Sequence, residues 1–144
     1  MKKIVAVFIF ICAGSAAWSQ KINASAVPPV VKQVFSSNHP GITPEWEKED
    51  GNFEASFKKN GHDMSCVIDH SGTILETETD IPVSELPKEA VLYLKTHYKG
   101  HKVKEASKIV KQNGEVNYEA MVKDRDVMFD VNGKYLKEIK EAKD

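Results

Sequence analysis

The stretch of sequence that decides the fold is FEASFKKNGHDMSCVIDHSG, residues 53 to 72. Apolar and polar side chains alternate from Phe53 to Phe57, and again from Met64 to Ile68, as they do on strands with one buried face. Between the two runs stands Asn60-Gly61, a pair that accepts the positive φ angles of a two-residue hairpin turn. The stretch therefore predicts a β-hairpin followed by a second turn at Gly72.

The same pattern returns about sixty residues later. At an offset of 59, Pro28 falls on Pro87, Phe35 on Leu94, His39 on Tyr98 and Gly41 on Gly100; at an offset of 61, Ile68-Asp69 and Gly72 fall on Phe129-Asp130 and Gly133. Because the offset changes along the chain, the loops between matching elements differ in length. This is the pattern of a duplicated structural unit. Asp69 and Asp130 each precede a turn glycine by three residues, so we expect their carboxylates to cap the backbone amides of these turns.

Each unit begins with a short amphipathic helix and continues in strands. Apolar residues recur at helical spacing after Pro28-Pro29, and again in a helix that opens between Ser84 and Pro87. The predicted strands cover residues 44–49, 53–58, 64–68 and 73–79 in the first unit and 103–110, 116–123, 127–131 and 135–139 in the second. We therefore predict an α+β fold: a tandem repeat of a helix and a four-stranded antiparallel meander, forming one sheet with both helices on one face.

The first 19 residues have the layout of a cleaved secretory signal peptide. Lys2 and Lys3 precede an apolar run from Ile4 to Cys12, and small residues follow it. Cleavage after Ser19 and cleavage after Ala17 both fit this layout. Removing residues 1–19 leaves 125 of the 144 residues, with 18 basic and 21 acidic side chains and a net charge of −3. We expect a periplasmic or extracellular protein with no membrane insertion after cleavage. The predicted organisation is a signal peptide at 1–19, a flexible leader at 20–26, and repeats at 27–80 and 84–140 that form one cooperative domain.

Pro-opened helices that end in a His/Tyr-x-Gly step, with Trp46, Phe53-Glu54-Ala55, Ile68-Asp69 and Gly72, resemble the PepSY-like family of secreted bacterial proteins. The resemblance covers residues 27 to 140 and is carried by structural residues. It implies a fold like that of the β-lactamase inhibitory protein, which binds an enzyme through loops and a concave sheet face. By this resemblance the chain is a non-catalytic module that inhibits or regulates a peptidase, lactamase or other envelope enzyme.

The residues themselves point away from catalysis and cofactors. The five histidines fall at helix ends and turns without the spacing of metal ligands, so we predict no metal site and no cofactor. No Gly-x-Ser-x-Gly motif pairs a serine with a base, so we predict no catalytic residues and no enzyme activity. Cys66, the one cysteine outside the signal peptide, alternates with Met64 and Ile68 and is expected to be a buried apolar side chain. The acidic balance and the lack of a basic patch argue against nucleic acid as a partner.

The expected binding surface is the sheet face opposite the helices, together with the first hairpin. That hairpin, from Phe53 to Asp69, is four residues longer than its counterpart in the second unit. Trp46 stands in a mostly polar strand, so it is either a core or edge tryptophan or an exposed anchor of the kind found at binding hot spots. The predicted binding residues are Trp46, Lys58, Lys59, Asn60, Gly61, His62 and Asp63, and the expected partner is an envelope or extracellular protein.

Two classes of binding partner remain open. A sheet face lined with exposed aromatic side chains and no deep pocket would indicate a protein. An enclosed apolar pocket of several hundred Å³ would instead indicate a small molecule or an envelope polymer held in the concave sheet.

Overall fold

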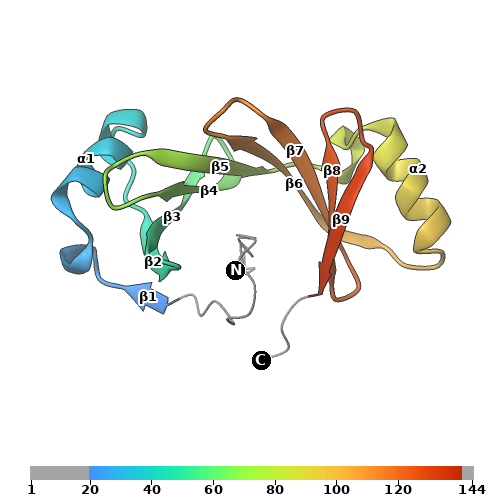
Figure 1. Cartoon of the computed structure of the whole chain (residues 1–144), viewed down its shortest axis with the longest axis horizontal. Coiled ribbons are helices and arrows are strands. Elements are labelled where there is room, and N and C mark those ends of the chain that lie inside the picture. Colours follow the sequence, from blue (N-terminus) through green and yellow to red (C-terminus); the bar gives the residue numbers. More distant parts are fainter. Residues whose placement is uncertain (1–19, 141–144) are drawn as a thin grey trace. The chain divides into compact units, whose positions relative to one another are not determined.

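The computed structural model describes residues 20 to 140 (Figure 1). The predicted signal peptide lies outside these residues. The strands are β1 (Gln20–Ile22), β2 (Glu45–Glu49), β3 (Asn52–Lys59), β4 (His62–Ile68), β5 (Ile74–Asp80), β6 (Val103–Lys111), β7 (Val116–Val122), β8 (Arg125–Asp130) and β9 (Tyr135–Lys140). The helices are α1 (Pro29–Asn38) and α2 (Lys88–His97), each preceded by a short 3-10 turn, η1 (Ala24–Ala26) and η2 (Val83–Glu85).

The predicted fold, an α+β tandem of one helix and four strands with both helices on one face, is wrong. The structure is mostly a single antiparallel sheet of nine strands in chain order, 48% strand and 21% helix. The strand that was not expected is β1, which lies in the segment predicted to be a flexible leader. It pairs with β2, where Ile22 stands opposite Trp46 and the Lys21 ammonium lies 2.8 Å from the Glu45 carboxylate. The three residues of β1 are too few to show the alternation of a strand. They form one because β2 leaves an open edge with which they pair.

The chain divides into two compact units, unit 1 up to Thr77 and unit 2 from Glu78. In unit 1, α1 packs through Val31 and Phe35 on the strand side chains of β2, β3 and β4. The Phe35 ring meets the edges of two neighbouring rings, with centroids 5.6 Å from Trp46 and 5.1 Å from Phe57. The buried core of unit 1 consists of Val27, Val31, Phe35, Trp46, Phe53, Ala55, Phe57, Cys66 and Ile68.

Unit 2 builds its core from smaller side chains around Phe129, which is completely buried. Helix α2 contributes Ala90 and Leu94, and the strands contribute alternating positions, as predicted. The members of this core are Leu86, Ala90, Leu94, Ala106, Ala120, Val122, Val127 and Phe129.

Prolines set where both helices begin. Pro28 and Pro87 have extended ψ angles of 143° and 141°, and the helices start one residue later. The predicted start of the second helix between Ser84 and Pro87 is therefore too early. Leu86 precedes a proline and is extended, with ψ at 144°, so Ser84 and Glu85 form the separate turn η2.

The two turns after the second hairpin strands follow the prediction. Asp69 Oδ1 accepts hydrogen bonds from the amides of Ser71 and Thr73, at 2.8 and 2.9 Å. Asp130 Oδ1 accepts the corresponding bonds from Asn132 and Lys134, each at 2.9 Å. The pKa of Asp69 is lowered, chiefly by the hydrogen bond from the Ser71 side chain and then by the Thr73 amide. These carboxylates cap the β4–β5 and β8–β9 turns, as the sequence predicted.

In the described part of the chain, neither helix has the length and the apolar composition needed to cross a membrane.

Candidate binding surface

Trp46 lies in the core of unit 1. Its side chain is 4% exposed, and it packs on Phe35 of α1. The structure thus shows the core tryptophan that the sequence left open as the alternative to a surface anchor. The polar neighbours of Trp46 on β2 reflect a strand with one buried face, because Glu45 and Glu47 point to the other side.

The first hairpin ends in a tight two-residue turn. Asn60 and Gly61 have φ angles of 52° and 82°, as the sequence predicted for this pair. Lys58 and Asp63 are cross-strand neighbours whose charged groups are 3.3 Å apart; the Lys58 side chain is exposed and the Asp63 side chain is partly covered. The extra residues of this hairpin lengthen the β3–β4 ladder and do not make a loop at its tip.

The strand face opposite the helices differs from the expectation for a protein-binding sheet. In unit 1 this face carries Glu54, Ser65 and Val67, all buried. In unit 2 it carries Ser107, Asn117, Asp126 and Met128, also buried. The aromatic side chains of the described strands belong to the helix-side cores or pack against them: Trp46, Phe53, Phe57, Tyr118, Phe129 and Tyr135. The opposite face of the described strands therefore offers no aromatic anchors.

Chemically reactive groups are few or inaccessible. Residues 20 to 140 contain no group of three or more histidine, cysteine or acidic side chains placed to hold a metal ion. Cys66 is fully buried, as predicted, and burial raises the pKa of its thiol to about 12, with the Glu54 charge adding to the shift. A thiol that stays protonated is a poor nucleophile.

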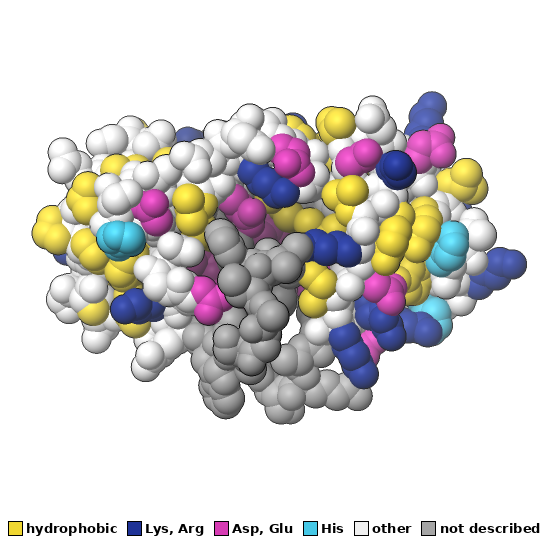
Figure 2. Space-filling model, viewed as in Figure 1, with side chains coloured by type: hydrophobic (Ala, Val, Ile, Leu, Met, Phe, Trp, Pro, Cys, Tyr) yellow, Lys and Arg dark blue, Asp and Glu magenta, His cyan; other side chains and the backbone are white. Residues whose placement is uncertain are grey.

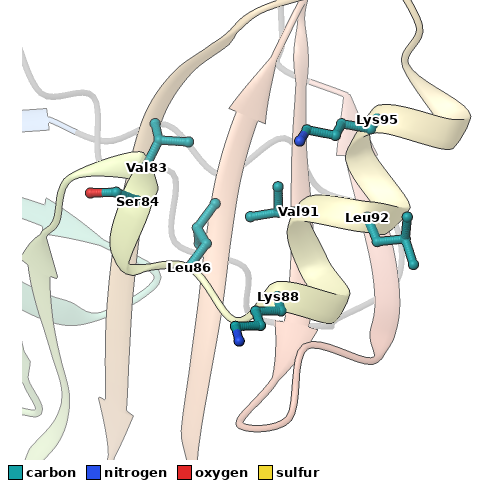
Figure 3. Close-up of a pocket in the computed structure, with 7 residues that line it drawn as sticks. All are labelled: Val83, Ser84, Leu86, Lys88, Val91, Leu92 and Lys95. Carbon is teal, nitrogen blue, oxygen red and sulfur yellow. The ribbon is translucent and has the colours of Figure 1, made fainter.

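An open apolar surface of unit 2 lies around α2. A groove of about 450 Å³ runs between η2 and α2, and we call it the η2–α2 groove (Figure 3). Val83 approaches it from η2, Leu86 from the link that follows η2, and Val91 from the helix, as Figure 3 shows. Leu92 is 60% exposed and Val83 38%. The groove is lined by Val83, Ser84, Leu86, Lys88, Val91, Leu92 and Lys95.

A second groove, of about 580 Å³, lies between α2 and the β8–β9 turn, and we call it the α2–β9 groove. Its wall is a stack of three rings: Tyr93 lies parallel to His97 at 3.9 Å and to Tyr135 at 4.8 Å between centroids. Burial raises the pKa of the Tyr93 hydroxyl, and Tyr135 and Glu138 add to the shift. Leu92 lines both grooves and forms the ridge between them. In Figure 2, hydrophobic side chains reach the surface beside histidines on the side where Figure 1 places α2 and β9.

At the matching positions unit 1 carries different side chains. At the offset of 59, Leu92 corresponds to Gln33, Val91 to Lys32, Lys95 to Ser36 and Val83 to Ala24. Tyr93, His97 and Tyr135 correspond to Val34, Asn38 and Ile74 at the offsets of 59 and 61. The sequence contained a signal for this surface: Leu92 falls outside the apolar stripe of Ala90, Val91, Leu94 and Tyr98 that packs on the sheet.

No family model and no curated protein matches this chain. Solved structures do. A proposed periplasmic protein of Bacteroides eggerthii superposes with a TM-score of 0.71 at 16% identity, over 79% of this chain and 88% of that one. A DUF2874 family protein of Bacteroides uniformis superposes with a TM-score of 0.71 at 16% identity, over 78% of this chain and 88% of that one. A BLIP-like protein of Bacteroides fragilis superposes with a TM-score of 0.62 at 19% identity, over 78% of this chain and 86% of that one.

The chain therefore shares its fold with DUF2874 and BLIP-like proteins of Bacteroides. This is the part of the predicted resemblance that the comparisons support. At such low identity the likeness concerns the fold alone.

Proposed function

We propose that this protein is an exported, non-catalytic module that binds another envelope or extracellular protein through the surface around α2. The observation that carries the proposal is Leu92, an apolar side chain that is 60% exposed on the ridge between two grooves. Exposed apolar surface that is contiguous and concave is typical of a binding site. The matching residue in unit 1 is the polar Gln33, so the fold itself does not require leucine at this place.

Two further observations support the proposal. The signal-peptide pattern of residues 1–19 favours export to the periplasm or beyond. The fold shared with a BLIP-like protein favours the finer form of the proposal, in which the partner is a peptidase, lactamase or other envelope enzyme that this protein inhibits or regulates, as in a PepSY-like module.

The alternative is a small molecule or polymer held in the sheet, which would need an enclosed apolar pocket. Both grooves around α2 are open, because their shared residue Leu92 is largely in solvent. Open apolar grooves suit the side chains of a protein partner better than a small molecule, most of whose surface must be buried.

The test is capture of a partner from the envelope fraction of the native organism, with the chain from residue 20 onward as bait. We compare the wild type with Leu92→Glu and with the matched control Gln33→Glu. A partner should be recovered equally by the wild type and the control, and at least about tenfold less by Leu92→Glu, because a central apolar anchor contributes more than about 1 kcal/mol. Equal recovery by all three proteins would place the binding site elsewhere.

The first hairpin remains a proposed second contact. Its tip, from Lys58 to Asp63, is exposed apart from partly covered positions at Lys59 and Asp63. Lys58→Ala with His62→Ala should weaken capture by about 1 kcal/mol or more if this hairpin touches the partner. The control is Lys123→Ala, at the turn of the β7–β8 hairpin. Unchanged capture by the hairpin variant would remove Lys58–Asp63 from the site.

A further inference from the structure

The η2–α2 groove combines an apolar floor with charge of one sign. Its apolar side chains are Val83, Leu86, Val91 and Leu92, and its only charged lining residues are Lys88 and Lys95. Within residues 20 to 140, neither ammonium group makes a hydrogen bond or an ion pair. Two cations therefore border this groove, and neither is paired with a carboxylate of the described chain.

The spacing of these residues follows from the helix. Val91, Leu92 and Lys95 stand three, four and seven positions after Lys88, so all four lie on one face. Seven residues at 1.5 Å each place the two lysines about 10 Å apart along the axis. The face thus presents charge, apolar surface and charge in sequence along about two helical turns.

The backbone around the groove selects the form of the partner. The lining residues come from η2, from α2 and from the link between them, and none comes from a strand. An extended peptide would find no sheet edge to pair with here. A helix satisfies its own backbone hydrogen bonds and can lay an apolar stripe into such a groove.

We propose that the partner presents an acidic amphipathic helix to the η2–α2 groove. This inference rests on the proposed function and names the chemistry of its partner. The partner's helix places leucine-like side chains between Val83 and Val91. Two of its carboxylates, seven residues apart, reach Lys88 and Lys95. Because both charges are exposed, salt weakens the electrostatic part of this binding.

The experiment uses defined peptides and does not depend on finding the native partner. The probe is a 15-residue alanine- and glutamine-based helical peptide with two leucines between two glutamates seven residues apart. One control peptide has lysine in place of both glutamates, and another has serine in place of both leucines. Binding is measured by titration of the isotope-labelled chain, residues 20–144, with backbone amide NMR signals as the readout.

The acidic peptide should shift the signals of residues 83–95 and bind at least about tenfold more tightly than either control, a ratio expected for one good contact. The double variant Lys88→Glu/Lys95→Glu should invert the preference and favour the lysine peptide. Equal binding of the acidic and basic peptides, no binding of any peptide, or shifts confined to other residues would each overturn the inference. So would binding to phosphatidylglycerol vesicles, abolished by the double variant, without binding of the acidic peptide.

This experiment separates the inference from the proposed function. If Leu92→Glu abolishes capture of the native partner but the peptides show no preference for charge, the surface is a protein-binding site and only the acidic helix is wrong. If capture does not depend on Leu92, the proposed function fails even where the acidic peptide binds.

Discussion

Helix α1 of unit 1 and helix α2 of unit 2 each contain ten residues, begin 59 residues apart and follow a 3-10 turn. Both pack two side chains into the core of their own unit, Val31 and Phe35 in one and Ala90 and Leu94 in the other. On the solvent side they differ: α1 shows Gln33 and Ser36 where α2 shows Leu92 and Lys95. Because the two helices pack in the same way, a surface residue that only one of them carries is not required by packing. It is therefore a better candidate for function than a residue that both units share.

The cores differ as well. Unit 1 packs Phe35 against Trp46 and Phe57, while unit 2 packs Leu94 and three alanines around Phe129. Unit 2 gains aromatic contact at its edge instead, in the stack of Tyr93, His97 and Tyr135. Experiments that change one unit and observe the other can therefore show how far the two are independent.

The largest effect is expected from Phe129→Ala in unit 2. Phe129 is completely buried, so its truncation should lower the free energy of unfolding by about 3–5 kcal/mol. Trp46, in unit 1, is the only tryptophan from residue 20 onward and reports on that unit by fluorescence. If the two units unfold as one cooperative domain, the fluorescence midpoint in urea falls together with the midpoint from circular dichroism. An unchanged fluorescence midpoint would show that the units unfold separately.

The next effect concerns the glycines of the two capped turns. A Cβ atom on Gly133 would lie 2.7 Å from the Ala90 backbone nitrogen, whereas one on Gly72 would lie 2.9 Å from a Val30 methyl group, which can move. Both residues have positive φ, which costs a side chain about 1–2 kcal/mol, and overpacking adds about 1–3 kcal/mol. Gly133→Ala should thus destabilise by about 2–5 kcal/mol, and Gly72→Ala by less.

Gly114→Ala is the control for this comparison. Gly114 also has a positive φ, but a Cβ there meets nothing within 4 Å, so it isolates the backbone cost. Urea unfolding of the three variants should rank them Gly133, Gly72 and Gly114. A loss at Gly133 no larger than at Gly114 would mean that α2 moves away from the turn at little cost.

A smaller effect should appear as pH dependence in unit 1. His39 packs between Phe35 and Phe57, and burial, followed by the charge of Lys59, lowers its pKa below 6.5. Well above pH 6.5 the ring is neutral in both the folded and the unfolded state. As the pH falls through 6.5, the unfolded chain takes up a proton that the folded protein resists, so the free energy of unfolding decreases until the lower folded-state pKa is reached.

His39→Gln should flatten this dependence between pH 7.5 and pH 5, measured by urea unfolding. Unit 2 has Tyr98 at the matching position, which does not titrate in this range. The exposed His101 serves as the control, and His101→Gln should leave the slope unchanged. A slope that persists in His39→Gln must come from other groups.

The smallest effect on stability is expected from exchanging the solvent-side residues of the two helices. Leu92→Gln and Gln33→Leu should each change the free energy of unfolding by no more than about 0.5 kcal/mol, because both side chains are exposed. A loss above about 1 kcal/mol in Leu92→Gln would show that Leu92 supports the fold, which would remove the reason to regard it as a binding residue.

Local patterns in the sequence determined much of the fold. Alternation placed Phe53, Ala55 and Phe57 on the helix side of the sheet, and Asn60-Gly61 set the hairpin turn. Asp69 and Asp130 were identified as turn caps from their distance to the next glycine. These features depend on a few neighbouring residues, and so a short stretch of chain is enough to predict them.

What the sequence left undecided depended on partners that are distant along the chain. β1 forms only because β2 offers it an edge, and this strand turned an expected eight-stranded sheet into one of nine. Trp46 could be a core residue or an anchor until Phe35 was seen to cover it. The surface around α2 likewise emerged only when the helix was in place, because packing decides which apolar side chains are buried and which, like Leu92, remain in solvent.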